Sequence, residues 1–189
     1  MRINRSLTLG FRQAKTVRVI TQDQRLAWIR ELLIGDSESL PYRVAGTLLL
    51  LYAQPLVKIA AIPMSRVLVA PDGLSIELGV TPSPVPQPFD QLLKEHIRKR
   101  PNLRTSGSDN EWLFPGYRPG EHLHPGTVML RLRQLGIDLL AARNTALREL
   151  VMQMPAPIVA EMLGYSDNVV HRHAELAAQP WSRYAAGNQ

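Results

Sequence analysis

The chain of 189 residues contains no cysteine and few aromatic residues. The lack of thiols excludes disulfide bonds and thiolate metal sites. The longest apolar run, "VAGTLLLLYA", has about half of the length that a membrane-spanning helix requires, so we expect no membrane segment. The basic N-terminal stretch lacks both a sustained apolar region and a small-residue cleavage site, which argues against secretion. We therefore expect a cytoplasmic protein, with which the lack of cysteine is compatible.

The composition indicates a folded, basic domain. Hydrophobic residues make up 45% of the chain and charged residues 20%, as in globular proteins. Lysine and arginine total 22 against 16 acidic residues, which gives a net charge of +6 and favours a polyanionic partner. Arginine predominates over lysine, and its guanidinium can bind two phosphate oxygens at once. The alternative is that the basic charge only reflects genome composition.

The N-terminal part of the chain predicts an arm followed by two helices. Residues 1–20 are interpreted as a basic arm or linker, and residues 21–189 as one domain. Thr21 and Gln24 form a capping-box pattern, and Leu26 and the apolar residues after it are spaced as in a helix that ends at Gly35. The second helix, "YRVAGTLLLLYA", is apolar on nearly every side, so we expect it to lie at the centre of the core.

The middle of the chain predicts a β-hairpin, an extended connector and a helix. Residues 66–80 alternate around a "PDG" turn, which is typical of two antiparallel strands. Prolines occupy every second position from Pro82 to Pro88, and we expect this run to pair with no strand. A helix, "FDQLLKEHIRKR", follows, and residues 101–111 are expected to form a loop.

The C-terminal part predicts four helices, at residues 127–135, 143–154, 158–163 and 168–178. In the first of them Val128, Leu132 and Leu135 share one face, so that Arg131 and Arg133 point outward as candidate DNA contacts. Either arginine could equally lie on an ordinary solvated face. The expected fold class is therefore mainly α with a small β-hairpin or sheet.

The order of these elements and motifs resembles the catalytic domain of tyrosine recombinases, the phage-integrase family. The motifs are the buried "LLLLYA" helix, a small sheet, "WLFPG", "RNTA" after a helix ending in "LGI", then "LGYSD" and a late tyrosine. The resemblance covers roughly residues 21–184. It implies a DNA breaking and rejoining domain in which a tyrosine forms a phosphotyrosyl intermediate and arginines hold the scissile phosphate, because phosphoryl transfer depends on positioned cations.

The resemblance assigns roles to particular residues. Arg143 matches the second phosphate-binding arginine and Tyr184 the nucleophile. Lys58 is the cation in the loop where the first arginine belongs, and Tyr165 stands where the family has the histidine of "LGH". His171, or else His173, is the candidate to replace a lost histidine. Arg172 and Arg183 join Arg131 and Arg133 as expected DNA contacts.

The sequence also departs from the family pattern. Leu140 stands where the family has a proton-exchanging histidine, and the hairpin contains no lysine. The family's usual N-terminal DNA-clamping domain is expected to be absent, so that the chain is a fragment of a longer recombinase or works with a clamp from another protein.

Three hypotheses remain open at this point. The first is an active, divergent recombinase or integrase of a mobile element, and the second is a decayed recombinase fold that binds DNA or a protein without cutting. The third is an unrelated helical interaction domain. Under the first two we expect double-stranded DNA as the partner, possible assembly with a second copy or a partner recombinase, nucleoid association, and no metal or other cofactor.

Overall fold

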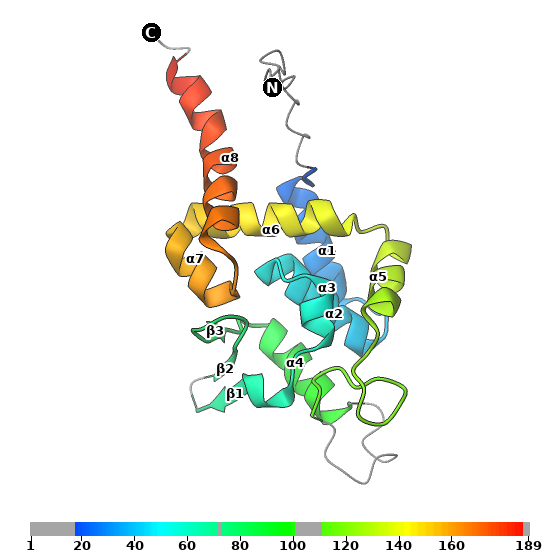
Figure 1. The fold of residues 1–189 in the computed structure, drawn as a ribbon. Helices are drawn as coiled ribbons and strands as arrows, with labels where there is room; N and C mark the ends of the chain where they lie inside the picture. Colours follow the sequence, from blue (N-terminus) through cyan, green and yellow to red (C-terminus); the bar gives the residue numbers. More distant parts are fainter. Residues whose placement is uncertain (1–17, 72, 101–110, 187–189) are drawn as a thin grey trace, which may run out of the picture.

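A computed structural model describes residues 18–71, 73–100 and 111–186, with only the backbone from residue 179 onward. The described elements are eight helices, one 3₁₀ turn and three strands, as seen in Figure 1: α1 (Gln22–Ile34), α2 (Leu40–Tyr52), α3 (Leu56–Ala60), η1 (Met64–Arg66), β1 (Val67–Ala70), β2 (Gly73–Ile76), β3 (Ser83–Pro84), α4 (Phe89–Arg98), α5 (Pro125–Gln134), α6 (Leu139–Gln153), α7 (Ala156–Leu163) and α8 (Asp167–Ala186). Residues 1–17 of the expected arm at residues 1–20, and most of the loop after α4, lie outside the described residues.

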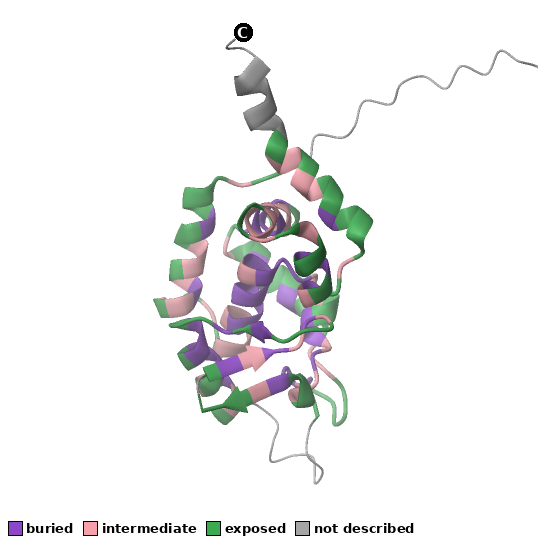
Figure 2. Ribbon diagram, turned by 90° about the vertical axis from the view of Figure 1, so that its left-hand side faces the viewer, coloured by how far each residue is buried: buried purple, intermediate pink, exposed green. Residues whose placement is uncertain are grey.

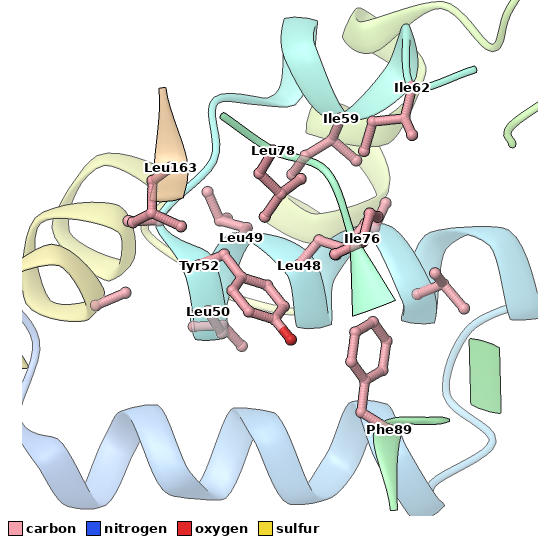
Figure 3. Close-up of a cluster of buried hydrophobic side chains, with 14 of the residues drawn as sticks. Leu48, Leu49, Leu50, Tyr52, Ile59, Ile62, Ile76, Leu78, Phe89 and Leu163 are labelled. Carbon is pink, nitrogen blue, oxygen red and sulfur yellow. The ribbon is translucent and has the colours of Figure 1, made fainter. Parts of the chain in front are cut away.

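Helix α2 is the centre of the core, as its sequence predicts. It packs against α1, α3, α4, α5 and α6, and its residues from Val44 to Leu50 are buried. Figure 3 shows its leucines meeting side chains from α3, the sheet, α4 and α7, among them Ile59, Ile76, Phe89 and Leu163. Buried residues accordingly gather in the middle of the molecule in Figure 2, with exposed residues on the outer helix faces.

Helix α1 begins at the predicted capping box. The Thr21 side chain accepts from the backbone of Gln24, and the Gln24 side chain accepts from the backbone of Thr21. The inward face differs from the expected one, because Leu26 is 51% exposed while Arg25 is buried. The Arg25 Nε donates to the Leu50 carbonyl at 2.9 Å, so a hydrogen bond satisfies the buried cation. The other predicted apolar positions of the helix, Ile29, Leu32 and Leu33, do contact the core.

The predicted hairpin is present, but the sheet has a third strand that the proline run had been expected to exclude. Strands β1 and β2 pair antiparallel with Ala70 opposite Gly73, and β3 pairs with the other side of β2, with Ile76 opposite Ser83. The expectation was wrong because the prolines alternate with residues that keep their N–H groups. The Val85 N–H donates to the Leu74 carbonyl at 2.8 Å, and β3 is an edge strand, where proline is tolerated.

The C-terminal helices follow the predicted order with shifted bounds. Helix α6 begins at Leu139, four residues before the expected start, because the Asp138 side chain accepts from two backbone N–H groups of the first turn. Gly164 ends α7 in the predicted left-handed conformation, with φ of 65°. Helix α8 extends to Ala186, beyond its expected end.

The architecture is mainly helical with one small antiparallel sheet, which confirms the expected fold class. In Figure 1, α6 lies across one end of the molecule above α2, with α7 and α8 at its C-terminal end. The sheet and α4 lie at the opposite end of the view. Among the residues described, no helix combines the length and the apolar character needed to cross a membrane.

Candidate nucleic-acid interface

Arg143 lies in the second turn of α6, where two hydrogen bonds fix its guanidinium. Its Nε donates to the Ala53 carbonyl at 3.1 Å and to the Tyr165 hydroxyl at 2.9 Å. The Tyr165 hydroxyl in turn donates to the same Ala53 carbonyl. In the part of the chain that the structure describes, no hydrogen bond or salt bridge involves the two terminal nitrogens of Arg143. These two nitrogens form the fork with which arginine binds an oxyanion.

Lys58 reaches the same place from α3. Its Nζ donates to the Gly164 carbonyl at 2.9 Å and lies 5.8 Å from the centre of the Tyr165 ring. The guanidinium carbon of Arg143 lies 5.4 Å from that ring. The structure therefore brings together three residues that the sequence singled out, with both cations close to the Tyr165 ring. Lys58 also has a structural use, since it ties α3 to the end of α7.

Tyr165 is suited to donating a hydrogen bond rather than to exchanging a proton. Burial raises the pKa of its hydroxyl, and the charge of Arg143 and its hydrogen bond oppose that rise. The hydroxyl therefore stays neutral at physiological pH. In this position it orients Arg143 and the Ala53 carbonyl.

At position 140, where the resemblance implies a proton-exchanging histidine, this chain has a leucine. Leu140, one turn before Arg143, is 57% exposed and apolar. The prediction that a helix begins at Arg143 was wrong, because Asp138 starts α6 a full turn earlier. The macrodipole weakens after the first turn, so it contributes little to anion binding at Arg143.

A cavity of about 760 Å³ opens beside Lys58, between α3 and the sheet. Lys58 and Arg66 line it together with two acids, Glu77 and Glu111. The mixed charge makes this cavity a poor phosphate site. The oxyanion fork of Arg143 is not part of its lining.

His173, rather than His171, faces the Arg143 side of the molecule. His171 is exposed, whereas His173 is half-buried. Burial lowers the pKa of His173, and the charges of Arg148, Arg143 and Arg172 lower it further. The greater burial of His173 could have been predicted from the helical repeat, because His173 follows the buried Val170 by three residues and shares its face.

Two residues near the site were missed by the sequence analysis. Arg148 is half-buried on α6. It follows the buried residues Ala141 and Thr145 by seven and three positions, and this helical spacing could have placed it on the inner face. The carbonyl of Ala53 had no such signal. Ala53 has a φ of 57°, a left-handed conformation that is usually occupied by glycine or asparagine.

The expected DNA contacts lie on different surfaces. Arg131 pairs with Glu38 at 3.6 Å and lies 5.5 Å from the centre of the Tyr42 ring, while Arg133 and Arg172 are exposed. Arg183 and Tyr184 belong to α8, but their side chains lie outside the described residues. Both therefore stay predictions.

Another cavity, of about 790 Å³, lies at a distinct place in the fold. It is bounded by the start of α2, the end of α4 and the loop before α5, and its lining includes His96, Tyr42 and Arg118. Arg143, Lys58 and Tyr165 are not among its lining residues. Arg118 is exposed there and offers an arginine that the candidate interface does not use.

The comparisons with known proteins concern the fold. No protein-family model matches the sequence, and no curated protein matches it. The structure is similar to that of the XerA recombinase, with a TM-score of 0.66 and 14% identity over 98% of this chain and 69% of that chain. It is also similar to the XerH site-specific recombinase bound to a palindromic difH substrate in a post-cleavage complex, with a TM-score of 0.65 and 16% identity over 97% of this chain. The chain spans 57% of XerH, and its mainly helical fold with a small sheet is similar to that of these two recombinases.

Proposed function

We propose that this chain is a recombinase-fold domain that binds duplex DNA through its phosphate backbone, with strand exchange weak or lost. The proposal rests on one observation above all. The guanidinium of Arg143 is held in place through Nε, while its terminal nitrogens have no partner among the described residues. An arginine positioned in this way matches a phosphate, because the fork binds two oxygens at once.

Charge and fold support DNA as the source of that phosphate. The net charge of +6 favours a polyanion, and duplex DNA presents a regular array of phosphates. The similar XerH structure contains a DNA substrate. We further expect the domain to assemble on DNA with a second copy or with a partner recombinase. We also expect it to associate with the nucleoid and to take part in the integration of a mobile element.

Weak or lost cleavage follows from the groups around Arg143. Leu140 cannot exchange a proton, and the Tyr165 hydroxyl is committed to the Ala53 carbonyl. Each lost charge-assisted contact to the transition state typically costs about 2 to 4 kcal/mol.

Binding is tested by fluorescence anisotropy with a labelled duplex oligonucleotide over a range of salt concentrations. We expect salt-sensitive binding of the parent protein, and we expect Arg143→Gln to weaken it by about tenfold to a hundredfold, as for the loss of a hydrogen bond to a charged group. Arg118→Gln removes the same charge from the other cavity and serves as the matched control. Salt-independent behaviour, or equal effects of the two variants, would contradict a phosphate site at Arg143.

Cleavage is tested with a nicked suicide substrate that traps a covalent protein–DNA adduct. At saturating DNA we expect little or no adduct from the parent protein, and binding by Tyr184→Phe equal to that of the parent. An abundant adduct that disappears in Tyr184→Phe would instead establish the active recombinase of the first hypothesis.

A further inference from the structure

Three guanidinium groups and one imidazole gather where α6 packs against α8. Arg143 and Arg148 come from α6, and Arg172 and His173 come from α8. The contact between these two helices is one of the most extensive in the fold, and Figure 1 shows the first half of α8 passing the C-terminal part of α6. The charges of all three arginines act on His173. The four groups therefore form a cationic cluster on two helices that pack against each other, and one of them is Arg143 with the candidate phosphate fork.

Two nitrogens of this cluster are buried and have no hydrogen-bond partner among the described residues. They are Nε of Arg148 and Nδ1 of His173. The Arg148 Nε always carries a hydrogen, since arginine does not deprotonate in proteins. Most buried polar atoms in proteins have a partner, so two exceptions on helices that pack against each other point to a group that binds here.

Acidic side chains do not neutralise the cluster within the described part of the chain. The salt bridges found there involve other pairs of residues, and none includes Arg143, Arg148 or Arg172. Glu149, the neighbour of Arg148, acts instead on Arg25. Glu161 on α7 and Glu175 on α8 are exposed. Like charges held together without a counter-charge are unfavourable, and a bound anion removes that cost.

We propose that Arg148 and His173 form a second phosphate site, which holds the DNA phosphate next to the one held by Arg143. This inference rests on the proposed function and adds two contacts to it. Arg148 donates from a fixed guanidinium at every pH. His173 binds a phosphate strongly only when its imidazole is protonated, so the second site depends on pH.

The sign of that dependence follows from the surroundings of His173. In the free protein, burial and the three guanidiniums keep the pKa of His173 below its usual value of 6.5. A phosphate beside the imidazole is an opposite charge and raises that pKa in the complex. Binding therefore takes up a proton, and affinity rises as pH falls through the pKa of the bound state, levelling off below the pKa of the free state.

The test compares His173→Gln with His171→Gln, its exposed neighbour on the same helix. DNA affinity is measured from about pH 7.5 to about pH 5.5, the range in which histidine changes charge. We expect the parent protein and His171→Gln to gain affinity on acidification, and we expect His173→Gln to lose about tenfold of that gain, the equivalent of one unit of pKa shift. We also expect Arg148→Gln to reduce the slope of log affinity against log salt by about one.

A second measurement follows the His173 imidazole by NMR, using inorganic sulfate as the probe because it stays a dianion throughout this range. We expect sulfate to raise the pKa of His173 in the parent protein and not in Arg148→Gln. If Arg148→Gln fails to fold, as judged by circular dichroism, the shift in the parent and the His173→Gln comparison decide the matter.

The outcomes separate this inference from the proposed function. If Arg143→Gln loses DNA binding while His173→Gln and Arg148→Gln bind with the parent's pH and salt dependence, the second site is overturned and the proposed function stands. If the parent binds no DNA, the proposed function fails, and the sulfate titration then decides alone whether an anion site exists. An unchanged pKa of His173 in sulfate overturns the anion site at Arg148 and His173.

Discussion

The hydroxyl of Tyr165 makes two hydrogen bonds in the candidate interface, and the variant Tyr165→Phe removes both while it keeps the ring. The hydroxyl donates to the Ala53 carbonyl and accepts from Nε of Arg143 at 2.9 Å. The ring contacts with Arg143 and Lys58 remain in the variant. The experiment therefore isolates the contribution of one oxygen atom.

The expected loss of stability is smaller than the sum of two such bonds. A hydrogen bond to a charged group contributes about 1.5 to 3 kcal/mol and a neutral one about 1 kcal/mol. Nε of Arg143 still donates to the Ala53 carbonyl at 3.1 Å, so neither group is left without a partner. We therefore expect Tyr165→Phe to lower the free energy of unfolding by about 1 to 2 kcal/mol.

Urea unfolding at neutral pH measures this difference, with the slope against urea checked for constancy. Tyr117→Phe is the matched control, because Tyr117 is 97% exposed and its loss of a hydroxyl should change stability by less than about 0.5 kcal/mol. Equal stabilities of the two variants would refute the role of the Tyr165 hydroxyl in holding Arg143.

Two further predictions concern the framework around the interface. Burial lowers the pKa of His96 to about 4, and its Nε2 donates to the Leu113 carbonyl at 2.9 Å. The neutral form is favoured in the folded state, so the stability is fully present above about pH 6.5. As the pH falls from there toward 4, up to about 3 kcal/mol should be lost in urea unfolding, and His96→Gln should lack that pH dependence. Gly79→Ala would place a methyl group 2.1 Å from the Glu161 carbonyl oxygen, and we expect a loss of about 2 kcal/mol or more in thermal unfolding. An effect no larger than that of Val80→Ala, at an exposed neighbour, would contradict this reasoning.

Most of the fold could be predicted because local signals and tertiary packing agree. The capping box at Thr21, the apolar α2 and the left-handed glycine at position 164 each specify a boundary or a face without reference to distant residues. Strand β3 could not be predicted, because its pairing depends on which N–H groups face β2 once the sheet has formed. Arg25 is a similar case, since its partner is the Leu50 carbonyl on another helix.

The candidate interface was predictable in its residue types and less so in its geometry. Arg143, Lys58 and Tyr165 follow from the order of motifs, and the structure brings them together. The sequence gives no measure of whether Tyr165 accepts, donates or exchanges a proton, because that depends on burial and on the atoms around its hydroxyl. The choice of His171 over His173 ignored the helical face set by Val170, and the two histidines differ in burial accordingly.

The backbone at Ala53 decides what the interface can do. The left-handed conformation at the end of α2 aims one carbonyl oxygen at groups that lie 90 and 112 residues further along the chain, Nε of Arg143 and the hydroxyl of Tyr165. With the hydroxyl donating to this carbonyl, Tyr165 can protonate a leaving oxygen only after that bond breaks, and its raised pKa makes it a weaker acid. The same three-centre arrangement restrains Arg143 through Nε, which reduces the entropy lost when a phosphate binds. An arrangement that immobilises a cation and ties up the nearest proton donor favours binding over cleavage, because binding needs the fixed charge alone.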